Sequence, residues 1–256
     1  MSNNCYFCGP IDNIVPKMER KRYVIIMAAG SGTRMGADRP KQFLELGGKA
    51  IIQQTIEVFM EASPGITVIT VLPEAFISHW RDYCYKKPFT CPQILVKGGI
   101  TRFHSVRNAL ERVPEGALVA VHDGVRPLIT PKLVADMFDM AENVPALIPV
   151  TPCVDTMKVL SKRKNEDGSE VLETIPGAVA DRSVLYGAQT PQIFHSEVLK
   201  ASYAQAYDTA FTDDASVVEK YGKSLSYTMG ERLNIKITTQ EDLLLAGAVM
   251  SLRNKA

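Results

Sequence analysis

The stretch from Tyr23 to Gly36 constrains the fold more than any other part of the sequence. An apolar run, Tyr23-Val24-Ile25-Ile26-Met27, precedes a glycine-rich segment, Ala28-Ala29-Gly30-Ser31-Gly32-Thr33-Arg34-Met35-Gly36. The run is typical of a buried first strand of an α/β sheet. Glycines let backbone N–H groups come close to phosphate oxygens, and Arg34 and Lys41 add two cations beside them. The sequence therefore predicts a polyphosphate-binding loop after the first strand.

Composition excludes several classes of protein. The chain has 256 residues, 46% of them hydrophobic, and 29 basic against 28 acidic side chains give a net charge of +1. Such a chain is long enough to bury a substantial core, and it carries no overall field that would attract nucleic acid or an anionic membrane. Its apolar runs are far shorter than a membrane span. Five scattered cysteines argue against a disulfide scaffold and for the reducing cytoplasm.

The first twenty residues differ from the rest. They show no periodicity, and Cys5 and Cys8 supply at most half of a tetrahedral zinc site. We expect residues 1–20 to be a disordered extension and residues 21–256 to form one domain.

From residue 23 onward, strand-like and helix-like segments alternate. This order is typical of βαβ units and a largely parallel sheet. The expected strands are 23–27, 66–72, 94–96, 117–121, 146–150, 225–229 and 234–237, and the expected helices include 51–62, 75–86, 130–141, 196–207, 214–221 and one capped by Thr239. The fold class is therefore α/β, a Rossmann-like, mostly parallel sheet flanked by helices.

The pattern changes at residues 154–176. Two strand-like segments, 155–160 and 170–175, flank a polar turn at 162–168, which indicates a β-hairpin with a charged tip. Its apolar residues suit an arm that packs on a second subunit. A hairpin folded back on its own domain fits the residues about as well.

Polar clusters follow several of the strands. The glycine loop, Gly98-Gly99, the segment Asp123 to Arg126, and the segment Asn234 to Lys236 all fall at such positions. Ligands of open parallel sheets bind at the carboxyl ends of strands, so we expect these clusters to converge. His122 reads as a packed strand-end histidine, and Asp213-Asp214 as a helix cap.

The glycine loop by itself leaves its ligand open. A dinucleotide site needs a helix that opens directly from the loop and an acid on the second strand. Here Pro40 interrupts such a helix, and the first acid after the second strand is Glu74. The Walker A pattern is also absent. Nucleotidyl transfer is thus favoured over a nicotinamide-dependent reductase.

Taken together, the motifs resemble those of sugar- and polyol-phosphate nucleotidyltransferases. The glycine loop with Pro40-Lys41-Gln42-Phe43 is similar to their signature loop. Further matches make the chain resemble the 2-C-methyl-D-erythritol 4-phosphate cytidylyltransferases of the non-mevalonate isoprenoid pathway over residues 22–252. These matches are Val121 to Pro127, Asp155-Thr156-Met157-Lys158, Thr190-Pro191-Gln192 and Asn234 to Thr238.

This resemblance implies an activity and a set of residue roles. CTP and methylerythritol phosphate would give the CDP-alcohol and pyrophosphate, with Mg²⁺ held mainly by the triphosphate and no direct protein ligand to the metal. The implied catalytic residues are Arg34 and Lys41, which would stabilise the transition state, and Arg182 and Lys236, which would position the attacking phosphate. The implied nucleotide-binding residues are Ala28, Ala29, Gly30, Gly32, Gly99, Ser105, Asp123 and Gly124, and the implied contacts to the alcohol phosphate are Arg126 and Thr156.

The resemblance also implies a homodimer in which the hairpin is the dimerisation arm. Thr156 and Arg182 would then act across the subunit interface. Two alternatives are a ribitol-5-phosphate cytidylyltransferase, which shares the loop, and a catalytically inactive nucleotide-binding protein. The presence of both Arg34 and Lys41 argues against the inactive protein.

Overall fold

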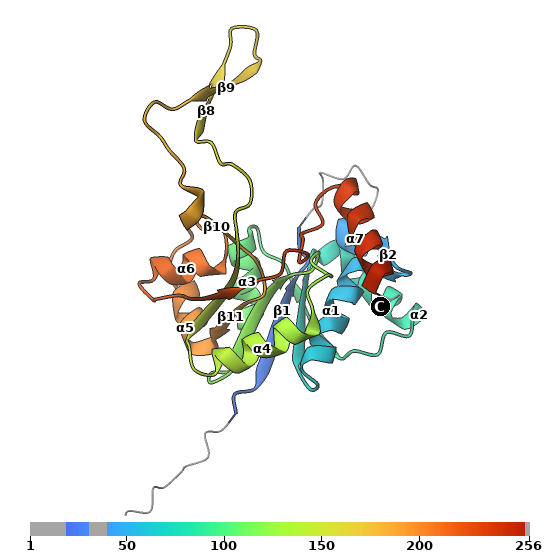
Figure 1. Cartoon of the computed structure of the whole chain (residues 1–256). Helices are drawn as coiled ribbons and strands as arrows, with labels where there is room; N and C mark the ends of the chain where they lie inside the picture. Colours follow the sequence, from blue (N-terminus) through green and yellow to red (C-terminus); the bar gives the residue numbers. More distant parts are fainter. Residues whose placement is uncertain (1–18, 31–39, 254–256) are drawn as a thin grey trace, which may run out of the picture.

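A twisted central sheet organises the chain in the computed structural model, which describes residues 19–30 and 40–253 (Figure 1). Within these residues the sheet has eight strands. Seven lie in the order β10-β7-β11-β6-β1-β4-β5, and the eighth, β12, pairs with β7. The strands are β1 (Arg22–Met27), β4 (Thr67–Leu72), β5 (Gln93–Lys97), β6 (Leu118–Asp123), β7 (Ala146–Pro152), β10 (Tyr186–Ala188), β11 (Gln192–His195) and β12 (Ser226–Met229).

Most neighbouring strands run in the same direction, as the sequence predicts. β1 pairs in parallel with β4 and β6, β4 with β5, and β7 with β12. β10 and β11 run antiparallel to β7, and β11 also pairs antiparallel with β6. The parallel strands therefore end at one edge of the sheet, which we call the carboxyl edge.

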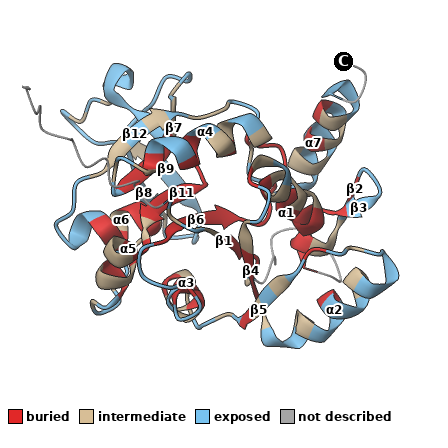
Figure 2. Cartoon of the chain, turned by 90° about the horizontal axis from the view of Figure 1, so that it is seen from below, coloured by how far each residue is buried: buried red, intermediate tan, exposed pale blue. Residues whose placement is uncertain are grey.

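Helices cover both faces of the sheet (Figure 2). One face carries α1 (Ile51–Ala62), α2 (Ile77–Lys86) and α4 (Pro131–Ala141), and the other carries α3 (Arg102–Leu110), α5 (Ser196–Tyr203) and α6 (Asp214–Lys220). Because successive residues of a strand point to opposite faces, Val24 and Ile26 pack on the first face and Ile25 on the second. This two-sided burial explains why β1 is apolar throughout.

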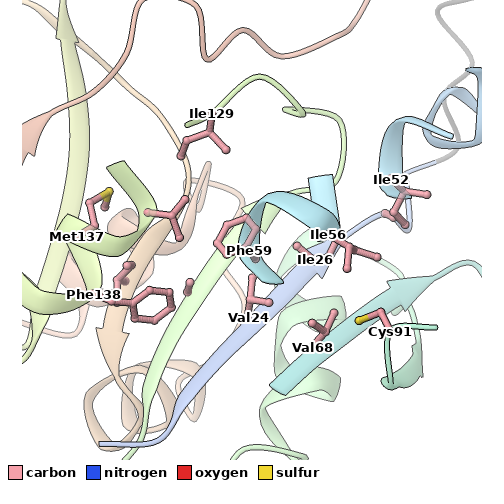
Figure 3. Close-up of a cluster of buried hydrophobic side chains, with 14 of the residues drawn as sticks. Val24, Ile26, Ile52, Ile56, Phe59, Val68, Cys91, Ile129, Met137 and Phe138 are labelled. Carbon is pink, nitrogen blue, oxygen red and sulfur yellow. The ribbon is translucent and has the colours of Figure 1, made fainter. Parts of the chain in front are cut away.

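The first face holds a closely packed core. Figure 3 shows Phe59 of α1 and Phe138 of α4 beside Val24 and Ile26 of β1, and all four side chains are fully buried. The expected start of α4 is confirmed, since the Thr130 hydroxyl accepts the Leu133 N–H at 3.2 Å and proline follows at the first helical position.

The C-terminal helix, α7 (Gln240–Arg253), packs on a smaller third cluster beside α1. The expected cap is present, because the Thr239 hydroxyl accepts the Asp242 N–H at 3.3 Å. Two short elements also belong to this region: the 3₁₀ turn η2 (Lys41–Phe43) and the small hairpin of β2 (Glu45–Leu46) and β3 (Lys49–Ala50).

The predicted hairpin extends away from the domain (Figure 1) and consists of β8 (Leu160–Lys164) and β9 (Glu170–Thr174). The expected first strand at 155–160 is wrong, because residues 155–159 are irregular and the strand lies in the charged segment that follows. Lys162 and Arg163 pair across the hairpin with Glu170 and Glu173, at 3.0 and 2.6 Å. These cross-strand ion pairs stabilise a strand in the charged segment, so the turn is shorter than the predicted 162–168.

The N-terminal prediction falls mostly outside the described residues, and so do Cys5 and Cys8. At the boundary, the Arg20 guanidinium donates to the Glu197 carboxylate at 3.0 and 2.7 Å.

Candidate active site

A cavity of about 490 Å³ opens at the carboxyl edge of the sheet. Eight of the predicted site residues line it, and they come from five separate segments of the chain: Ala28, Ala29, Gly30, Lys41, Gly99, Ser105, Asp123 and Lys236. The expected convergence of polar clusters is therefore confirmed for these residues. Arg34 and Gly32 lie outside the described residues.

Gln42 joins the two sides of the glycine loop. Its buried amide nitrogen donates to the Ala28 carbonyl at 2.7 Å and to the Gly30 carbonyl at 3.4 Å. Ala28 is also fixed by its own N–H, which donates to the Val71 carbonyl at 3.0 Å. Because Lys41 precedes Gln42, these hydrogen bonds set where Lys41 enters the cavity wall. Gln42 belongs to the Pro40-Lys41-Gln42-Phe43 motif, but the motif by itself does not indicate a structural role for the glutamine side chain.

Glycines are required where β5 meets α3. A Cβ on Gly98 would lie 2.6 Å from the Ala29 Cβ, and one on Gly99 would lie 2.5 Å from the His104 Cβ. The Gly99 N–H donates to the Ser105 hydroxyl at 2.9 Å, and that hydroxyl donates to the Thr101 carbonyl at 2.9 Å. Ser105 therefore braces the backbone of the cavity wall.

Asp123 lies at the centre of the charged groups, at the end of β6. It is 8% exposed, and its Oδ2 accepts from Lys236 Nζ at 3.0 Å and from Arg126 Nε at 3.2 Å. Burial alone would raise the pKa of Asp123, but Lys236, Arg102 and Arg126 outweigh it and hold that pKa well below the ordinary value. Asp123 is thus an ionised carboxylate that fixes two cations.

Lys236 is held in place by an irregular segment. The expected strand at 234–237 is wrong, because the hydrogen bonds of this segment go to side chains and loops rather than to a neighbouring strand. The Asn234 amide nitrogen donates to the Thr190 carbonyl at 2.9 Å and to Gln189 Oε1 at 3.3 Å, and the Asn234 carbonyl accepts from Arg126 Nη1 at 2.8 Å. The Thr190 hydroxyl in turn accepts the Asp123 N–H at 3.1 Å.

Arg102 is a cavity residue that the sequence analysis missed. Its guanidinium donates to both carboxylate oxygens of Asp214, at 2.8 and 2.6 Å. Asp213 caps α6, as expected, since its carboxylate accepts the Ser216 N–H at 2.8 Å. Asp214 is not part of that cap. Its burial and its partner were not visible in the spacing of the sequence.

Gly124 and His122 support β6 rather than line the cavity. A Cβ on Gly124 would lie 3.1 Å from both Ile26 Cγ2 and the Met27 carbonyl oxygen, so the chain passes close to β1 here. The His122 ring is fully buried against Phe59, with ring centres 4.9 Å apart, and burial lowers its pKa to about 4. The interpretation of His122 as a packed histidine is confirmed.

Arg182 and Thr156 do not line the cavity of their own chain. Both are exposed and lie at the base of the hairpin, where Arg182 Nη1 donates to the Val154 carbonyl at 2.9 Å. Arg126 does not line the cavity either, and its guanidinium donates to Asp123 and to the Asn234 carbonyl. The structure therefore brings together six of the eight predicted nucleotide-binding residues but leaves most of the predicted contacts to the alcohol phosphate outside the cavity.

The α/β sheet, with its glycine-walled and lysine-bearing cavity at the carboxyl edge, has the features expected from the sequence of a nucleotidyltransferase. A family model described as 2-C-methyl-D-erythritol 4-phosphate cytidylyltransferase matches residues 23–252, and the chain belongs to this family.

Similar proteins of known name agree. A 2-C-methyl-D-erythritol 4-phosphate cytidylyltransferase from Phocaeicola vulgatus is 44% identical over 225 residues, which are 88% of this chain and 97% of the relative. One from Bacteroides thetaiotaomicron is 41% identical over 230 residues, 90% of this chain and 100% of the relative. The crystal structure of 4-diphosphocytidyl-2C-methyl-D-erythritol synthase from Anaerococcus prevotii has a TM-score of 0.71 at 27% identity and covers 91% of this chain and 99% of its own.

The chain is therefore an enzyme that transfers a cytidylyl group from CTP to 2-C-methyl-D-erythritol 4-phosphate in isoprenoid synthesis. The match favours this alcohol over ribitol 5-phosphate and excludes the reductase. Across residues 19–30 and 40–253, no helix combines the length and the apolar character needed to cross a membrane.

Proposed function

We propose that the cavity at the carboxyl edge binds CTP and that Arg34, Lys41, Arg182 and Lys236 are the catalytic cations. The observation that supports this most strongly is the convergence of eight predicted site residues on one cavity. A cavity of about 490 Å³ is also of the size that holds a small molecule. Ala28 to Gly30 and Gly99 lie in its wall, where small residues let a nucleotide approach the backbone closely.

The reaction joins two anions. A phosphate oxygen of the alcohol attacks the α-phosphorus of CTP in line, a new P–O bond forms, and the bond from the α-phosphorus to the bridging oxygen breaks to release pyrophosphate. Positioning and charge stabilisation supply most of the catalysis in such a transfer. Lys41 and Arg34 stabilise the charge on the five-coordinate phosphorus. Lys236, held by ionised Asp123, faces the cavity to position the attacking phosphate.

The residues of the cavity fit Mg²⁺ carried in with the triphosphate. Mg²⁺ in nucleotide sites commonly takes one or two carboxylates together with substrate phosphates. Among the described residues no cluster of three or more metal-ligating side chains occurs, and Asp123 is the carboxylate in the cavity wall. The metal would supply positive charge that neutralises the phosphates, and it would be held mainly by the triphosphate.

The site is completed by a second copy of the chain. The arm exposes several apolar side chains, which a partner subunit would cover: Leu160, Val171, Leu172 and Ile175. In such a homodimer Arg182 and Thr156, together with Arg126, contact the alcohol phosphate. We place the enzyme in the cytoplasm, which agrees with the unpaired state of Cys84, Cys91 and Cys153.

Thermal unfolding with Mg²⁺ and each nucleoside triphosphate tests the assignment of the cavity. We expect CTP to raise the melting temperature more than UTP, because a ligand that binds only the folded state stabilises it. Pyrophosphate release with each alcohol phosphate then tests the substrate. Greater protection by UTP, or a higher kcat/KM for ribitol 5-phosphate, would contradict the proposal.

A further inference from the structure

A buried ion pair connects the cavity wall to the interior of the domain. Arg102 is the first residue of α3 and lines the cavity, where its side chain is 31% exposed. Its partner Asp214 is the first residue of α6 and is 0% exposed. The two side chains form a bidentate pair at 2.8 and 2.6 Å, and Asp214 does not itself line the cavity.

The carboxylate of Asp214 is fixed by more than Arg102. The Tyr203 hydroxyl donates to Oδ1 at 2.5 Å, and the Tyr203 ring stacks on Phe103 with centres 4.7 Å apart. The start of α6 is held to β11, because Gln192 donates to Asp213 at 2.8 Å and accepts the Ala215 N–H at 2.8 Å. Asp214 therefore offers Arg102 a rigid anchor.

Arg102 also has a competing carboxylate within its electrostatic reach. Asp123 lies across the cavity wall, and Arg102 is one of the three cations that lower the pKa of Asp123. Arg102 is instead paired with Asp214, a carboxylate that lies outside the cavity wall.

We propose that Asp214, with Tyr203 behind it, is a positioning residue for CTP, because it holds Arg102 in the cavity wall with donors directed at the nucleotide. This inference rests on the proposed assignment of the cavity to CTP. A guanidinium has five N–H donors in a fixed plane, and Asp214 receives two of them, so the remaining edge is oriented by the pair. These N–H donors require a ligand rich in hydrogen-bond acceptors, which a nucleotide provides.

The inference differs from a role in folding alone. A buried ion pair that serves only the fold changes stability when it is broken and leaves both substrates bound as before. A pair that positions Arg102 changes the affinity for CTP and leaves the KM of the alcohol phosphate close to its original value.

Calorimetric titration with CTP and Mg²⁺, in the absence of the alcohol, measures the effect on the full-length enzyme. We expect Asp214→Asn to weaken CTP binding about tenfold and Tyr203→Phe about threefold, because hydrogen bonds to charged groups are lost. The KM of the alcohol phosphate should change by no more than about twofold, since a tenfold change would mean that the alcohol phosphate itself had lost a contact. In an Arg102→Gln background, Asp214→Asn should weaken CTP binding no further.

Glu197→Gln is the matched control. It disrupts a second bidentate arginine–carboxylate pair, with Arg20 at 3.0 and 2.7 Å, whose residues do not line the cavity, so the melting temperature should fall while the affinity for CTP stays unchanged.

Two results overturn the inference: CTP affinity that is unchanged in Asp214→Asn despite a lower melting temperature, or a further loss in the double variant. If Asp214→Asn does not fold, Tyr203→Phe decides, and unchanged CTP affinity there overturns it. Absence of CTP binding by the unmodified enzyme would instead contradict the proposed function.

Discussion

The carboxyl edge of the sheet and the hairpin arm both carry predicted site residues, but under opposite physical conditions. At the carboxyl edge, Asp123 is 8% exposed and is bound by Lys236 and Arg126 within the same chain. On the arm, apolar Leu172 is 62% exposed, and the ion pairs of the hairpin connect only its own two strands.

This contrast indicates that the two parts of the site are organised in different ways. Buried polar groups must be paired when the chain folds, so a single chain sets the geometry of the described residues of the proposed nucleotide half. Exposed apolar groups on a protruding hairpin gain by meeting a partner, so the proposed alcohol-phosphate half, which includes Arg182 and Thr156, would depend on assembly. The comparison predicts that variants at the two regions fail in different ways.

The largest effect is expected at the carboxyl edge, from Lys41→Ala. Loss of a cation that acts mainly on the transition state should lower kcat about a thousandfold, with little change in melting temperature. Lys49→Ala is the control, since Lys49 forms a partly exposed ion pair with Glu57 at 2.7 Å on the same part of the chain. Steady-state kinetics and circular dichroism measure both. Unchanged turnover in Lys41→Ala would remove it from the catalytic residues.

The next effect tests whether the two halves come from different chains. Arg182→Ala alone should lower kcat/KM about a hundredfold through loss of a phosphate contact. Co-expression of Arg182→Ala chains with Lys41→Ala chains should restore about a quarter of the activity, because half of the dimers are mixed and each mixed dimer has one intact site.

Arg182→Ala paired with Thr156→Ala is the negative control for this complementation. Arg182 and Thr156 of one chain are both predicted to act in the partner's site, so each site of a mixed dimer lacks one of them. No recovery in the test pair would place the two halves in one chain, and recovery in the control would mean that Arg182 and Thr156 of one chain serve different sites.

A smaller effect is expected from the apolar surface of the arm. Leu172→Asp should weaken the dimer in sedimentation and, with about a tenth of the chains still paired, lower kcat/KM for the alcohol about tenfold, because a charge is costly in an apolar interface. CTP binding should persist. Leu252→Asp, at a 69% exposed position on α7, should leave both the oligomeric state and the activity unchanged. If the Leu172→Asp variant were fully dimeric, Leu172 of the arm would not belong to the dimer interface.

The same contrast explains what the sequence could predict. Strands β1 and β4 and helices α1 and α4 follow from apolar periodicity and a Thr-Pro start, which are local signals. Most of the nucleotide half follows from the rule that ligands bind at the carboxyl ends of strands.

Other features depend on partners that are distant in sequence. Asp214 meets Arg102 across 112 positions, and Asn234 meets Thr190 across 44, so neither contact has a local signature. The first strand of the arm was predicted too early in the sequence for a related reason. Lys162 and Arg163 are typical of a turn, and only their pairing with Glu170 and Glu173 places them in a strand. Pairing overrides the local preference of charged residues for turns.

The carboxyl edge should also respond to pH in a way that the arm does not. Burial lowers the pKa of His122 from 6.5 to about 4, so between these values the unfolded chain binds a proton that the folded chain does not. Stability from this site is therefore complete above pH 6.5 and declines as the pH falls toward 4. The window lies above the titration of Asp123, whose lowered pKa matters only in stronger acid.

We expect the free energy of unfolding to fall by about 2 kcal/mol between pH 6.5 and about pH 4.5 through His122. Denaturant titrations across this range measure the slope, and His122→Gln should flatten it, because the amide carries no titrating proton. Asp167→Asn, at the exposed turn of the arm, is the matched control and should leave the slope as it is. If the His122→Gln variant kept the slope of the unmodified enzyme, the pH dependence would arise elsewhere. The carboxyl edge would then not differ from the arm in its response to pH.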